Sequence, residues 1–203
     1  MKKLFIFAAA LTLTVGAFGQ GTIVGSAHDF STEAWNTGGQ ICVVCHTPHN
    51  ADLTINDSPL WNHEVTTATY TLYSSSTLDA TPGQPGGYSK LCLSCHDGTV
   101  ALDSFGGETG STNISGNALF GTDLSNDHPI SITYDTSLAS TDGELYDPTT
   151  ASSGLGGTID ADMLFASKME CASCHDVHNK PGIEKLLLKS NAASALCLTC
   201  HSK

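Results

Sequence analysis

The strongest apolar run lies at the start of the sequence. Lys2 and Lys3 precede an apolar stretch over residues 4–18, and the small residue Gly19 marks a cleavage point. A membrane-spanning helix needs roughly 20 apolar residues, so this run of about 15 is too short for an anchor. The pattern predicts a signal peptide over residues 1–19 and an exported, soluble mature chain over residues 20–203 that does not span a membrane.

Long periodic patterns are missing from the rest of the chain. Gly, Ser, Thr, Asp and Asn fill much of residues 97–170, which predicts turns and short strands, such as residues 130–134, rather than helices. Helix is expected around the cysteine-containing segments and at residues 183–188. We therefore predict a mostly coiled chain with short helices and a few short β pieces.

The composition makes an ordinary aliphatic core hard to build. Hydrophobic residues make up 40% of the chain, but aromatic residues only 7%, and there are 20 glycines among 203 residues. Few large side chains are available to fill an interior. Disorder is not predicted either, because the hydrophobic content is substantial and long charge blocks are missing. Something besides side chains is expected to supply part of the core.

The charge balance excludes one class of function. Eight basic residues, all of them lysine, stand against 20 acidic ones, giving a net charge of −12, and loss of Lys2 and Lys3 with the signal peptide would leave about −14. A chain without arginine lacks the forked donor that reads phosphates and guanines, and an acidic surface repels nucleic acid. DNA and RNA binding are therefore not expected.

All eight cysteines fall in one repeated motif. Each belongs to a Cys-x-x-Cys pair that is followed directly by histidine: Cys42, Cys45 and His46; Cys92, Cys95 and His96; Cys171, Cys174 and His175; Cys197, Cys200 and His201. Cys-x-x-Cys-His is the attachment motif of c-type haem. Zinc sites and disulfides also use paired cysteines, but neither requires a histidine after every pair.

The spacing has a chemical reason. Two thiols three positions apart can both form thioethers to the vinyl groups of one porphyrin, and the next residue can turn its imidazole onto the iron as the proximal ligand. Four motifs predict four covalently attached haem c groups, with the porphyrins stacked as much of the core. Roughly 46 residues of the mature chain would surround each haem.

Five further histidines are candidates for the second axial position. They outnumber the four vacancies by one, and methionine is scarce, so we expect four of the five to be distal ligands: His28, His49, His63, His128 and His178. The sequence does not decide which is spare. His49 and His178 each follow a proximal histidine by three positions. The two ligands of one iron lie on opposite faces, so each of these two is expected to reach a different haem.

The chain contains an internal duplication. The segment from Cys42 to Asn50 matches that from Cys171 to Asn179, and the motifs at Cys92 and Cys197 also match each other. We divide the mature chain into a first haem pair at 20–100, a Gly/Ser/Thr-rich insertion at 101–168 and a second haem pair at 169–203, all in one tetrahaem domain.

Several segments resemble the OmcE-type extracellular tetrahaem cytochromes of metal-reducing bacteria, within the broader doubled Cys-x-x-Cys-His families. The broader likeness is carried especially by residues 171–201, and the OmcE-type likeness by residues 28–30, 42–50, 61–65, 92–98 and 128–130. The resemblance implies bis-histidine haems, little regular structure and polymerisation into filaments, in which a histidine of one subunit can complete a haem of the next. On that basis His28 is our candidate for the intermolecular ligand.

These features favour electron transfer over catalysis, because iron with two histidine ligands has no open position for a substrate. We expect an extracellular or cell-surface protein that forms a head-to-tail filament. It would take electrons from outer-membrane or periplasmic cytochromes and pass them to minerals, electrodes or other redox partners. A monomeric periplasmic electron shuttle is the alternative, and a multihaem reductase with one open iron is a less favoured one.

Overall fold

The computed structural model describes residues 23–56 and 58–202. The predicted signal peptide at 1–19 lies outside the described residues. Within these residues, four short α-helices are formed, α1 (Gly87–His96), α2 (Thr136–Asp142), α3 (Ile159–Met163) and α4 (Cys197–Cys200). Two-residue strands β1 (Ile132–Thr133) and β2 (Lys168–Met169) pair antiparallel. Single 3-10 turns occupy Phe30–Thr32, Gly116–Ala118, Cys171–Ser173, Glu184–Leu186 and Ala192–Ser194.

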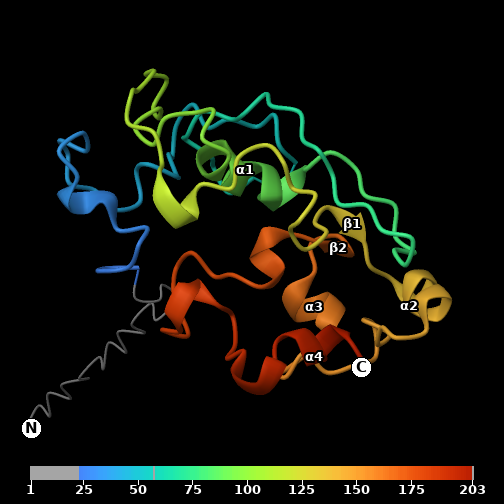
Figure 1. The fold of residues 1–203 in the computed structure, drawn as a ribbon. Coiled ribbons are helices and arrows are strands. Elements are labelled where there is room, and N and C mark those ends of the chain that lie inside the picture. Colours follow the sequence, from blue (N-terminus) through green and yellow to red (C-terminus); the bar gives the residue numbers. More distant parts are fainter. Residues whose placement is uncertain (1–22, 57, 203) are drawn as a thin grey trace, which may run out of the picture.

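The expectation of a mostly coiled chain with a few short helices and little β structure is confirmed. In Figure 1, α1 lies with the blue-to-green first half of the chain, and α3 and α4 lie with the orange-to-red second half. The predicted strand at 130–134 contains β1, which pairs with β2 in the register Ile132 to Met169. This pairing joins the insertion to the segment that leads into the third motif.

Two helical predictions were wrong in detail. Residues 183–188 form a single 3-10 turn in which Lys185 has φ of 59°, a left-handed conformation that an α-helix does not contain. Conversely, residues 97–170 do contain helices. The side chain of Asp135 caps α2 by accepting from the N–H of Leu138, and Gly143 ends α2 with φ of 73°. Local capping therefore outweighed the poor helix propensity of this stretch.

The side chains build two small apolar clusters. The larger joins the insertion to the second haem pair and contains Ile159, Met163 and Met169, which are 0%, 1% and 6% exposed. The smaller packs Leu93 of α1 against Tyr70 and Leu124. Met163 and Met169 are thus core residues.

Candidate functional site

The eight cysteines are all free thiols and form no disulfide with one another. The second motif lies on the last two turns of α1, and the fourth lies on α4. The third begins with the 3-10 turn Cys171–Ser173, and the first is held by turns alone. The expected helix around the motifs is therefore present at two of the four. Each pair keeps both sulfurs available for thioether formation.

Three of the proximal histidines are oriented by the same kind of hydrogen bond. The Nδ1 atoms of His46, His96 and His175 lie 2.6, 2.7 and 2.9 Å from backbone carbonyl oxygens, those of Pro59, Ala118 and Lys185 respectively. With Nδ1–H donating to a carbonyl, Nε2 carries the free lone pair and can bind a metal. This second partner fixes both the tautomer and the ring direction that a proximal haem ligand needs.

The first and third motifs sit in matching backbone frames. Behind each proximal histidine, a returning segment places one leucine with positive φ, Leu60 at 53° and Leu186 at 57°. The same two backbone hydrogen bonds form in both halves. In the first half, the Thr47 N–H donates to Leu60 O and the Asn62 N–H to Cys45 O. In the second half, the Asp176 N–H donates to Leu186 O and the Leu188 N–H to Cys174 O. The internal duplication inferred from sequence therefore extends to the backbone.

Three of the five additional histidines face a proximal histidine. Ring centroids are 6.2 Å apart for His46 and His178, 6.0 Å for His96 and His28, and 6.4 Å for His201 and His128. Two metal–nitrogen bonds of about 2 Å, together with the half-widths of two imidazoles, would separate the rings by roughly 6 Å. The spacing in all three pairs therefore fits one iron held between two rings.

His28 has a buried ring nitrogen. Its Nδ1 is buried without a hydrogen-bond partner. Burial, and then the neighbouring His96, lower the pKa of His28 to about 4. A neutral imidazole with an unused ring nitrogen is suited to metal ligation and poorly suited to any other buried role.

The remaining two candidates, His49 and His63, differ from this pattern. His63 is 2% exposed, with Nδ1 2.8 Å from Glu64 O and Nε2 3.0 Å from Ala101 O, of which a neutral ring can donate to one. Its Nε2 also lies 3.5 Å from Cys95 Sγ of the second motif. His49 is exposed on the loop after the first motif. His175 is the proximal histidine that belongs to none of the three pairs. Within residues 23–56 and 58–202, neither His49 nor His63 forms a ring contact with it.

Large apolar side chains are exposed beside the proximal histidines. Leu60, next to the carbonyl that orients His46, is 53% exposed, and Leu198 of the fourth motif is 47% exposed. Phe120, 52% exposed, stacks on His96 at 5.3 Å. Such a distribution is expected where a flat apolar group covers the surface next to each ligand. The residues present therefore fit attached porphyrins.

The cysteine thiols of successive motifs are electrostatic neighbours. Burial, followed by the charge of Cys42, raises the pKa of Cys45 to about 11. Burial, followed by the charge of Cys45, raises that of Cys95 to about 12. Contact with Cys171, then burial, raises the pKa of Cys92. Burial, followed by the charge of Cys174, raises the pKa of Cys200 to about 11. The thiols of neighbouring motifs are therefore close enough to influence one another: Cys45 acts on Cys95, Cys171 on Cys92 and Cys174 on Cys200.

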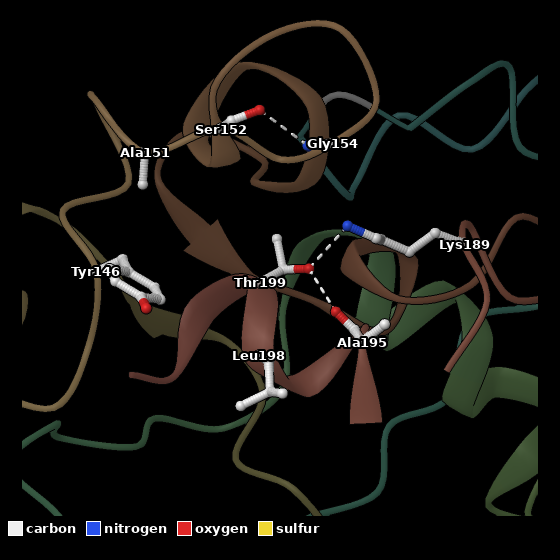
Figure 2. Close-up of a pocket in the computed structure, with 8 residues that line it drawn as sticks. All are labelled: Tyr146, Ala151, Ser152, Gly154, Lys189, Ala195, Leu198 and Thr199. Carbon is white, nitrogen blue, oxygen red and sulfur yellow. Dashed lines mark hydrogen bonds between the residues drawn. The ribbon is translucent and has the colours of Figure 1, made fainter. Parts of the chain in front are cut away.

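A small pocket adjoins the fourth motif. It has a volume of about 350 Å³ and is lined in part by Leu198, Thr199, Tyr146 and Lys189. Figure 2 shows Lys189 pointing towards Thr199, and its Nζ donates to Thr199 Oγ1 at 2.9 Å and to Ser153 O at 2.6 Å. Lys189 therefore ties α4 to the insertion. Nothing in its sequence context predicted this role.

The comparisons with known proteins agree with the motif chemistry. Residues 164–203 match the protein family described as doubled CXXCH motif, which covers the second haem pair. The comparison with curated proteins finds no match for the chain. The motifs imply a c-type haem protein with covalently bound haem c. The helices that the structure describes include none with the length and apolar character needed to cross a bilayer.

Proposed function

We propose that this protein transfers electrons through four covalently attached haem c groups, each held by two histidines, and that it is not an enzyme. The observation that carries the proposal is the set of three histidine pairs with ring centroids 6.0–6.4 Å apart. Haem c supplies a one-electron couple between ferric and ferrous iron. The chain's own residues supply the thioether sulfurs, both axial nitrogens and the carbonyl oxygens that orient the proximal rings.

The fourth ligand pair follows from the duplication. His178, three residues after the third proximal histidine, crosses to His46 of the first motif. The matching backbone frames of these two motifs favour the reciprocal arrangement, in which His49 serves the site of His175. His63 is then the spare histidine, because its ring nitrogens lie against carbonyl oxygens instead. His28 becomes an intramolecular ligand opposite His96, in place of the intermolecular role that the resemblance suggested.

The first and the fourth attachment sites are the more exposed ones, which supports transfer of electrons between molecules. Cys42 of the first motif and Cys197 of the fourth are exposed, whereas the other six cysteines are partly or fully buried. Electrons could therefore enter at one of these sites and leave at the other. Subunits that associate head to tail through two different surfaces, without closing a ring, generate an open filament. We propose such a filament outside the cell or at its surface, with outer-membrane or periplasmic cytochromes as donors and minerals or electrodes as acceptors.

The first experiment is mass spectrometry and potentiometric titration of the protein purified with its haems. We expect a mass increment of four haems and four reversible low-spin components. Fewer than four attached haems would overturn the proposal. Electron microscopy of the same sample separates the filament, which would show a regular repeat, from a monomeric periplasmic shuttle, which would show small uniform particles.

A multihaem reductase is the competing function from a different class. It would need one iron with an open or displaceable ligand, and the site of His175 is the one for which no ring pair is formed among the described residues. Carbon monoxide added to the reduced protein tests this directly. Bis-histidine ligation at all four sites predicts no binding, whereas one equivalent bound would favour the reductase.

A further inference from the structure

A buried carboxylate lies at the junction between the second and third attachment sites. Glu170 directly precedes Cys171 and is only 3% exposed. It is the N-cap of the turn Cys171–Ser173, where its side chain accepts from the N–H of Ser173. The hydroxyl of Ser173 in turn accepts from the N–H of Glu170 at 2.9 Å. This capping box fixes the carboxylate at the start of the third motif.

The same carboxylate reaches the helix that carries the second motif. Glu170 Oε2 accepts from the N–H of Ser89, in the first turn of α1, at 3.1 Å, and from the hydroxyl of Ser131, also at 3.1 Å. A return bond closes the junction, because the N–H of Cys171 donates to Ser89 Oγ at 3.0 Å. Glu170 is thus bonded to both haem-bearing segments at once.

The groups around Glu170 donate hydrogen bonds that favour its ionised form, but they do not neutralise its charge. Its three partners are all donors, two backbone N–H groups and one hydroxyl, which is the arrangement that an ionised carboxylate accepts. In the part of the chain that the structure describes, Glu170 pairs with no lysine. The charge of Glu170 acts on one cysteine of each motif, Cys92 and Cys171. After contact with Cys171, burial and the other thiol charges, Glu170 also contributes to raising the pKa of Cys92.

We propose that Glu170 is a tuning residue whose buried charge lowers the reduction potentials of the haems attached at the second and third motifs. This inference rests on the proposed electron-transfer function. Ferric haem carries one more positive charge than ferrous haem, so a nearby buried anion favours the oxidised form. One residue placed between two sites lowers both potentials together, which keeps these two haems closely matched for electron exchange.

The test is potentiometric titration of the haem-loaded Glu170→Gln variant, followed by optical spectroscopy. Gln keeps the size and an acceptor oxygen but removes the charge. We expect the equilibrium constant for reduction to rise roughly threefold or more at two of the four haems, where a tenfold change corresponds to 59 mV for a one-electron couple. Glu170→Asp, which keeps the charge, should stay close to the wild-type protein.

Two further variants separate charge from structure. Glu184→Gln removes the same charge from an exposed position on the same C-terminal segment, and solvent screening should leave the potentials nearly unchanged. Ser131→Ala removes a donor from the carboxylate, so the charge is less compensated and the two potentials should fall. Loosened packing is not expected to lower the two potentials. A fall in Ser131→Ala therefore tests the role of the Glu170 charge even if Glu170→Gln fails to retain its haems.

The inference is overturned if Glu170→Gln titrates as the wild type does, or if Ser131→Ala leaves the potentials unchanged or raises them. Either result would leave four reversible haems in the wild-type protein and so would not touch the proposed function. Failure of the wild type to hold four reversible haems would instead remove both proposals.

Discussion

The imidazole rings of His46 and His178 lie 11° from parallel with their centroids 6.2 Å apart, although the two residues belong to different halves of the chain. The orientation of His46 is fixed from behind by the carbonyl of Pro59. His178 is placed by the turn that follows the third motif, where its N–H donates to Asp176 Oδ1 at 2.9 Å. The two halves of the duplicated chain are therefore brought together at a pair of facing histidines.

Replacing His178 by alanine should convert one haem of four from low spin to high spin or mixed spin, because its iron loses one axial nitrogen. Electron paramagnetic resonance of the oxidised, haem-loaded protein measures this directly. His63→Ala is the matched control, since the same substitution at a histidine whose ring nitrogens lie against carbonyl oxygens should leave all four low-spin signals intact. Loss of a low-spin signal in His63→Ala would contradict our choice of the spare histidine.

Replacing His28 by alanine tests whether this ligand comes from the same chain. If His28 binds the haem attached beside His96 within one molecule, its loss should remove one low-spin signal even in dilute, unassembled protein. The ring separation of 6.0 Å and the burial of His28 Nδ1 support this outcome. If the spectrum of the dilute variant matches that of the dilute wild type, and the two differ only after assembly, the ligand is intermolecular instead.

Tyr70→Phe should lower the free energy of unfolding by about 2 kcal/mol, the usual net value of a hydrogen bond to a charged group. The hydroxyl of Tyr70 donates to Asp97 Oδ2 at 2.5 Å in a buried network that also includes Thr66. This network lies next to His96, at the end of α1. Denaturant unfolding monitored by circular dichroism gives the value. Tyr73→Phe is the control, since Tyr73 lies outside the network, and an equal loss there would rule out a specific role for Tyr70.

The contribution of Asp103, in the 103–112 loop, to folding stability should depend on pH. Partial desolvation would raise the pKa of Asp103, but hydrogen bonds from the N–H groups of Thr112 and Ser111 lower it overall from its ordinary value of 3.8. A folded-state pKa below the unfolded one stabilises the fold above about pH 4, and this contribution is lost as pH falls through the folded-state value. The difference in urea midpoint between wild type and Asp103→Asn should therefore be larger at pH 7 than at pH 3. An equal difference at both pH values would contradict this assignment.

Part of the fold was accessible from sequence because it depends on local composition. The scarcity of long amphipathic patterns predicted a coiled chain with short elements. The errors arose where a few side-chain contacts decided the local backbone. Asp135 and Gly143 cap α2 within a stretch that looked too rich in turn formers, and the positive φ of Lys185 breaks the helix expected at 183–188. A prediction that averages helix propensity over a window of residues does not detect a single capping hydrogen bond or a single backbone conformation.

The sequence by itself determined the chemistry at the attachment sites. Thioether formation and proximal ligation need only neighbouring residues, so Cys-x-x-Cys-His carries that information within five positions. What only the tertiary structure decided is which distant histidine faces which proximal one, and that the ring nitrogens of His63 lie against carbonyl oxygens instead. The same holds for Glu170, whose three donors come from α1, from Ser131 and from its own turn. These relations join segments far apart in the chain, and no local spacing records them.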